Sequence, residues 1–273
     1  METTATTDKN GSWTAEFHDA VMFGDEPCPH CDGSQMLRVG NHSSQCPCQE
    51  LKWKRKTIER ILPLRYHRSN LYTLQPSTAS KLPLERQQQL IDLLRKRENR
   101  DKGYFLYGVP GTSKTTFAAA LVRNAIERDW RRWLYKNGPM KWDRSMWIRY
   151  INWDGLMGEY LAYQNDRNAD PPSVTAKLIR EAAEADRRPV LCIEEIDKSR
   201  LTEYKANKLF DLVQAIDANK GQLIITTNHK SKEDFEAFLY KTDNEAINLA
   251  GEPVWRRIMD NCTPVRFEQE AHA

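Results

Sequence analysis

The stretch GVPGTSKTT, residues 108–116, decides the fold. Gly108 is followed five positions later by Ser113 and then by Lys114 and Thr115, so the stretch departs at one position from the pattern G-x-x-x-x-G-K-[ST]. A short apolar segment, YFLYG, precedes it, and a segment with helical spacing of apolar residues follows it. Backbone N–H groups at such a strand–loop–helix junction point at phosphate. The stretch therefore predicts a phosphate-binding loop.

The residues of this loop have distinct expected roles toward ATP and Mg²⁺. Lys114 would bridge the outer phosphates, and the Thr115 hydroxyl would bind Mg²⁺. Ser113 replaces a glycine, and because serine is small we expect only a modest conformational cost. The loop residues expected to bind ATP are Gly108, Val109, Pro110, Gly111, Thr112, Ser113, Lys114, Thr115 and Thr116.

In the stretch VLCIEEID, residues 190–197, a second apolar segment ends in two adjacent acids. We expect Glu194 to hold Mg²⁺ together with Thr115, and Glu195 to polarise the attacking water as a general base. Aspartate is usual at the first of the two positions, so Glu194 is one methylene longer than the pattern requires. A buried strand with an acidic turn is the alternative interpretation.

Two further segments downstream offer catalytic side chains. LIITTN is an apolar segment that ends at Asn228, which could position the lytic water. The predicted helix VWRRIMDN carries Arg256 and Arg257, and one of them could reach the γ-phosphate bound by a neighbouring subunit. A solvated basic helix face explains either arginine equally well.

From Gly103 onward, predicted strands alternate with predicted helices. This order indicates a parallel sheet with helices on both faces. The expected strands cover residues 104–108, 146–152, 189–195, 221–228 and 263–267, and the expected helices cover residues 114–129, 153–163, 173–185, 203–217 and 252–261.

The order and spacing of these motifs resemble those of AAA+ ATPases. More narrowly, IRYINWDGLMGEYL, DKSRLTEYKANKLFDLVQAI and IITTNHK resemble the helicase-loader group of DnaC and DnaI type and the IstB-type transposition helpers, over about residues 65–267. The resemblance implies an α/β P-loop NTPase fold, a three-layer sandwich with a central parallel sheet and no C-terminal lid domain. It also favours Arg257 as the arginine finger, because the family's arginine precedes an aliphatic residue, here Ile258.

Four of the six cysteines lie close together in CPHCDGSQMLRVGNHSSQCPC. Two close thiolate pairs separated by a loop suit tetrahedral Zn²⁺, and His30 or His42 could replace one sulfur. A metal-free cluster or a redox-active pair are the alternatives. The ligands we expect are Cys28, Cys31, Cys46 and Cys48. By resemblance, such a finger contacts a partner helicase or DNA.

A basic segment follows the cysteines. LKWKRKTIERILPLRYHR, residues 51–68, places lysines and arginines near Trp53 and Tyr66, a combination that binds single-stranded DNA, although a solvated linker helix fits it too. A tryptophan-rich segment, residues 128–144, is either an insertion that contacts DNA or docks a partner, or ordinary helix packing with a polar outer face. The expected organisation is a disordered lead-in at 1–24, a zinc finger at 25–50, the basic linker helix at 51–68 and an AAA+ ATPase domain at 69–273.

Composition sets outer limits on function. The net charge is only +3, and no apolar run is long enough for a membrane span. Cysteine usage suits the cytoplasm. The resemblance implies a homo-oligomeric replication ATPase that acts on single-stranded DNA and a replicative helicase. The alternatives are a transposition helper that recruits a transposase and an adaptor that binds ATP without hydrolysing it.

Overall fold

The computed structural model describes residues 22–23, 28, 30–31, 33–34, 36–39, 42–46, 48–96, 102–137, 147–166, 168–185 and 187–268. The expected lead-in at 1–24 lies outside these residues except for Met22 and Phe23. The side chains of the tryptophan-rich segment lie outside them from position 130 onward, and so does its backbone after position 137.

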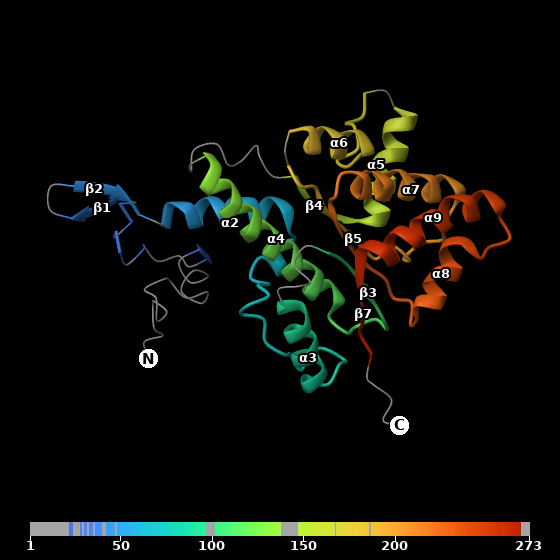
Figure 1. Ribbon diagram of the computed structural model, residues 1–273, viewed down its shortest axis with the longest axis horizontal. Coiled ribbons are helices and arrows are strands. Elements are labelled where there is room, and N and C mark those ends of the chain that lie inside the picture. The colour runs from blue at the N-terminus through green and yellow to red at the C-terminus, as the bar shows by residue number, and fades with distance from the viewer. Residues whose placement is uncertain are drawn as a thin grey trace.

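A five-stranded parallel sheet forms the centre of the fold, in the order β4-β5-β6-β3-β7 (Figure 1). Strands β5 and β6 are rich in isoleucine, leucine and valine, β3 is rich in aromatic residues, and all three are buried along their whole length. Such runs are typical of strands covered on both faces. The strands are β3 (Gly103–Tyr107), β4 (Ile148–Asn152), β5 (Val190–Glu194), β6 (Gln222–Thr226) and β7 (Cys262–Arg266).

Helices cover both faces of this sheet, which confirms the expected three-layer fold (Figure 1). Alternate residues of β3 point to opposite faces: Tyr104 and Leu106 pack with α2, α3 and α4, and Phe105 packs with the helices of the other face. The first layer comprises α2 (Cys48–Ile61), α3 (Leu84–Arg95) and α4 (Lys114–Asn137). The second comprises α5 (Trp153–Asn165), α6 (Ala176–Glu184), α7 (Glu203–Ala218), α8 (Lys232–Tyr240) and α9 (Glu245–Asn261).

Side-chain caps fix where several of these helices begin. The Asn152, Thr175 and Thr202 side chains each accept a hydrogen bond from a backbone N–H three residues later. Ser231 and Asp234 cap α8 reciprocally. Because these polar groups satisfy N–H donors that lack helical partners, each helix starts directly after its strand or loop.

The last helical region is longer than the sequence predicted. Helix α8 was not expected, and α9 begins at Glu245 rather than at position 252. Gly251 and Pro253 are both residues that disfavour helix interiors. Both are nevertheless inside α9, where Gly251 allows close packing: a Cβ there would lie 2.0 Å from the Leu239 carbonyl oxygen of α8.

The N-terminal module contains a small antiparallel hairpin, β1 (Met36–Val39) and β2 (His42–Gln45), which the sequence did not reveal. The basic helix α2 starts at Cys48, inside the expected finger, and ends at Ile61, before Pro63. The short 3-10 helix η1 (Leu64–Tyr66) follows it. Residues 51–68 thus contain most of α2, which ends before Pro63 as expected, and then η1.

Candidate ATP site and cysteine cluster

The loop after β3 has the backbone of a phosphate-binding loop. Gly108 and Gly111 have positive φ angles of 135° and 84°. A Cβ on Gly108 would lie 2.4 Å from the Phe267 carbonyl oxygen, so only glycine fits there. The Thr112 hydroxyl donates to the Val109 carbonyl at 2.8 Å, and the loop then leads directly into α4.

Ser113 occupies the left-handed region of backbone conformation, with φ of 69°. This explains why the common pattern has glycine at this position, since a side chain in this region costs about 1–2 kcal/mol. The serine therefore keeps the shape of the loop and adds local strain.

Lys114 points back across the loop and is 6% exposed. Its Nζ donates to the Gly108 carbonyl at 2.6 Å and to the Val109 carbonyl at 2.8 Å. Burial lowers its pKa to about 8, while the charges of Asp197 and Glu195 act in the opposite direction. The ammonium group is thus held at the mouth of the loop, where a phosphate would meet it.

Glu194 ends β5 and is buried, with 7% exposure. The Tyr150 hydroxyl, from the neighbouring strand β4, donates to its Oε2 at 2.8 Å. Burial raises the pKa of Tyr150, and the charge of Glu194 and the hydrogen bond to it raise this pKa further. Tyr150 therefore stays a proton donor that fixes the orientation of this carboxylate.

Glu195 lies one residue later and is more accessible. Its φ of 52° is also left-handed, and its backbone N–H donates to Thr226 Oγ1 at 2.9 Å. The carboxylate pairs with Lys198 at 3.2 Å, and Asn152 Nδ2 lies 3.5 Å from it. The two adjacent acids thus differ in exposure: Glu194 is buried, and the Glu195 side chain is 38% exposed.

Asn228 follows β6 at the same edge of the sheet. Its backbone N–H donates to Asp197 Oδ2 at 2.9 Å, which ties the β6 loop to the loop after β5. The carboxyl ends of adjacent parallel strands meet at one edge, where ligands bind in open α/β sheets. The phosphate-binding loop, both acids and Asn228 are therefore brought together at this edge.

A cavity of about 500 Å³ opens beside the loop and the two acids. It is lined by Arg60, Ile61, Leu62, Pro63, Arg65, Thr115, Tyr150, Asn152, Glu194, Glu195 and Lys198. Thr115 and Glu194, the residues expected to hold Mg²⁺, thus share one cavity, and a hydroxyl with a carboxylate is a donor set that suits this ion.

The sequence pattern of the ATPase family associated with various cellular activities (AAA) matches residues 104–244, which contain the loop, both acids and Asn228. The chain belongs to the AAA family of ATPases. Among curated proteins, none matches it.

The fold of this AAA chain is similar to several solved structures. The DnaC helicase loader is 20% identical with a TM-score of 0.45, covering 74% of this chain and 98% of that one. DnaI is 14% identical with a TM-score of 0.46, covering 75% and 93%. AMPPCP-bound DnaA from Aquifex aeolicus is 13% identical with a TM-score of 0.45, covering 76% and 51%. These sequence identities and TM-scores are too low to indicate the function of this AAA chain.

The two arginines of α9 lie away from the site of their own chain. Arg257 pairs with Asp217 at 3.2 Å, and its side chain is 27% exposed. Arg256 pairs with Glu252 at 3.3 Å, with 68% of its side chain exposed. Arg257 lines a cavity with Lys102, which precedes β3, and Gly221, which precedes β6. This is the amino edge of the sheet, opposite the phosphate-binding loop, so neither arginine serves the loop of its own chain.

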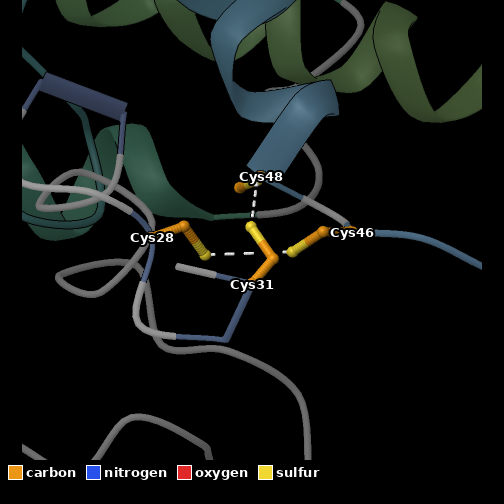
Figure 2. Close-up of side chains that lie close together, drawn as sticks. All are labelled: Cys28, Cys31, Cys46 and Cys48. Atoms are coloured by element: carbon orange, nitrogen blue, oxygen red, sulfur yellow. Dashed lines mark hydrogen bonds between the residues drawn. The ribbon is translucent and has the colours of Figure 1, made fainter. Parts of the chain in front are cut away.

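The four expected ligands of the N-terminal module come together (Figure 2). Cys28 Sγ lies 3.8 Å from Cys46 Sγ, Cys31 Sγ lies 3.4 Å from Cys48 Sγ, and all four sulfur atoms lie within 4.8 Å of one another. Sulfur atoms around a tetrahedral Zn²⁺ lie about 3.8 Å apart, given Zn–S bonds of about 2.3 Å. The cluster, buried and without a disulfide bond, therefore fits zinc.

Sequence reasoning missed several residues of the site. Tyr150 and Asn152 are on β4, and Asp197 follows the two acids. Asn152 could have been found, because it is a polar residue at the carboxyl end of a predicted parallel strand. Tyr150 could not have been found, because an aromatic residue inside a strand usually packs in the core.

Within the described residues, no helix combines the length and apolar character that crossing a membrane requires.

Proposed function

We propose that this AAA protein is an ATP-hydrolysing DNA replication protein, and that it loads a replicative helicase. In this proposal it works in the cytoplasm as a homo-oligomer on single-stranded DNA. The zinc finger covers residues 25–50, the basic linker 51–68 and the ATPase domain 69–273.

The proposed hydrolysis relies on residues held at one edge of the sheet. The backbone of the loop and Lys114 bind the phosphates of ATP. Thr115 and Glu194 hold Mg²⁺, which neutralises charge on the phosphate oxygens when bound. Glu195, facing the cavity, accepts the proton of the attacking water, and Asn228 orients that water.

The observation that supports DNA binding is the position of α2, which joins the cysteine cluster to the ATPase domain. Helix α2 begins at Cys48, and Lys52 and Lys56 are exposed on it, while Lys54 is buried beside Glu50 at 3.3 Å. The same helix ends at the ATP cavity. Exposed lysines on this helix supply positive charge that can bind the phosphate backbone of DNA. Because the helix ends at the proposed ATP site, the bound nucleotide could control DNA binding.

The test is binding of a fluorescent single-stranded oligonucleotide, with and without a non-hydrolysable ATP analogue. We expect ATP-dependent binding, and a salt dependence whose slope becomes shallower by about 0.7 for each DNA phosphate that Lys52→Ala/Lys56→Ala no longer neutralises. The matched control is Lys177→Ala/Arg180→Ala, two exposed basic residues on α6. Equal losses of affinity in both variants would contradict a specific role for α2.

Two further measurements separate the proposed loader from its alternatives. A loader binds a purified replicative helicase hexamer and prefers single-stranded DNA, whereas preference for duplex DNA would indicate a transposition helper. Absence of ATP turnover under all these conditions, with ATP binding intact, would indicate a non-hydrolysing adaptor.

A further inference from the structure

The cavity beside the catalytic acids has a wall that no catalytic motif accounts for. One side comes from the ATPase core, and the other comes from the end of α2 and from η1, which supply Arg60 and Arg65. Two guanidinium groups from a segment outside the AAA match thus share a cavity with Thr115, Glu194 and Glu195.

Tyr66 fixes the position of Arg65 in this wall. The Arg65 guanidinium carbon lies 4.6 Å from the centre of the Tyr66 ring, within the range of a cation–π contact. The Tyr66 hydroxyl lies within the electrostatic reach of the two acids. Burial raises its pKa, the charge of Arg65 lowers it, and the charges of Glu194 and Glu195 raise it. Arg65 is therefore stacked on a ring close to the acids that line the cavity.

Both acids of the cavity already have partners, so Arg65 can interact with negative charge that a ligand brings. Lys198 already pairs with Glu195 at 3.2 Å, and the Tyr150 hydroxyl already binds Glu194. A nucleotide brings several more negative charges to the same place. The guanidinium group presents a planar fork of donors that matches phosphate oxygens, and stacking on an aromatic ring leaves the edge of that fork available.

We propose that Arg65 binds the terminal phosphates of the ATP held by the phosphate-binding loop of its own chain, with Tyr66 holding it in place and Arg60 adding positive charge. The inference rests on the proposed ATP site. Arg65 would act in cis, in contrast to the arginines of α9, which lie at the opposite edge of the sheet.

The first test is the affinity for fluorescent ATP and ADP analogues. Arg65→Ala should weaken ATP binding about tenfold to a hundredfold, as expected for one hydrogen bond to a charged group, and should weaken ADP binding less. Arg65→Lys should recover part of the affinity. Arg68→Ala is the matched control, because Arg68 is exposed on the same segment but does not line the cavity. Thermal unfolding of each variant shows whether it is folded.

The second test distinguishes cis from trans action. Arg65→Ala subunits, mixed with Lys114→Ala subunits, should not regain turnover, because no subunit then has both the loop lysine and the arginine. Regained turnover would overturn the proposal and place Arg65 at a neighbour's site. Unchanged affinity for ATP in folded Arg65→Ala, with weaker binding of single-stranded DNA alone, would overturn it in favour of a DNA contact. Failure of the wild-type protein to bind ATP would instead overturn the proposed function.

Discussion

Cys48 and Arg60 stand near the two ends of one helix. Cys48, the first residue of α2, has its sulfur 3.4 Å from that of Cys31, and Arg60 lines the cavity that contains Glu194 and Glu195. They are twelve positions apart along the α-helix, a rise of about 18 Å. Because a helix is stiff over this length, α2 links the cysteine cluster to one wall of this cavity, which is the proposed ATP site.

We expect one Zn²⁺ per chain, and we expect its loss to affect the ATP site. Cys28→Ser/Cys31→Ser should reduce zinc from near one per chain to near zero by elemental analysis, because two of the four sulfur ligands are removed. The affinity for ATP should then fall as the start of α2 loses its anchor. Cys262→Ala, a change at a buried cysteine of β7 outside the cluster, is the control and should keep its zinc. Zinc retained in the double variant would place the metal elsewhere.

Ser113→Gly should stabilise the protein without loss of ATP binding. Glycine removes the left-handed strain at φ 69°, but it also gains freedom in the unfolded chain, so we expect a net gain of about 1 kcal/mol or less in free energy of unfolding. Denaturant unfolding measures the gain, and nucleotide titration measures the affinity for ATP, which should be unchanged or higher.

Lys220→Gly is the matched control for that substitution. Lys220 has a similar φ of 51° in the turn after α7, outside the ATP site. It should gain similar stability and leave the affinity for ATP unchanged. A fall in affinity in Ser113→Gly alone would mean that the serine itself contributes to nucleotide binding.

Substitutions of the two adjacent acids, Glu194 and Glu195, should have different effects on ATP binding and hydrolysis. Glu195→Gln removes the expected general base but keeps the shape of the phosphate-binding loop, so ATP should still bind while hydrolysis stops. Glu194→Gln changes the group that the Tyr150 hydroxyl contacts at 2.8 Å, and we expect it to weaken the Mg²⁺ dependence of ATP binding instead. Titration with ATP at several Mg²⁺ concentrations, beside single-turnover hydrolysis, distinguishes the two. If only Glu194→Gln binds ATP normally without hydrolysing it, the two roles are exchanged.

The sequence predicted the parts of this molecule in which a local pattern determines the structure. Apolar runs such as VLCIE, followed by polar residues, indicated the parallel strands and the edge at which Glu194 and Asn228 meet. The spacing of the four cysteines predicted their cluster. In both cases the residues that matter lie at the ends of short, strongly patterned segments.

The parts that the sequence did not reveal depend on contacts between distant segments. Helix α9 contains both Gly251, which packs against the end of α8, and Pro253, whereas the local pattern shows only two residues that disfavour helices. Arg65 belongs to a segment that looked like a linker, and only the packed chain brings it beside residues 115 and 194. Basic composition alone indicated a nucleic-acid contact there and gave no sign of a place in the ATP cavity.

Arg256 and Arg257 are the candidates for an arginine finger, and their position in the fold limits how either of them could act. Both are on α9 at the amino edge of the sheet, so a finger on this helix must act on the ATP of a neighbouring subunit. Turnover per subunit should therefore rise with protein concentration, and more steeply on single-stranded DNA. We expect Arg257 to be the finger, although it is paired with Asp217 and Arg256 is more exposed.

Removing the finger should lower turnover about a thousandfold or more, because it removes positive charge from the γ-phosphate in the transition state. Arg257→Ala subunits still have Lys114, and Lys114→Ala subunits still have Arg257, so mixing the two inactive variants should restore part of the turnover at mixed interfaces. Arg257→Ala also breaks the ion pair with Asp217, and Asp217→Asn is therefore the control: it should leave turnover largely intact. Complementation by Arg256→Ala instead would make Arg256 the finger. Turnover that is independent of concentration, with neither variant complementing, would mean that each subunit works alone.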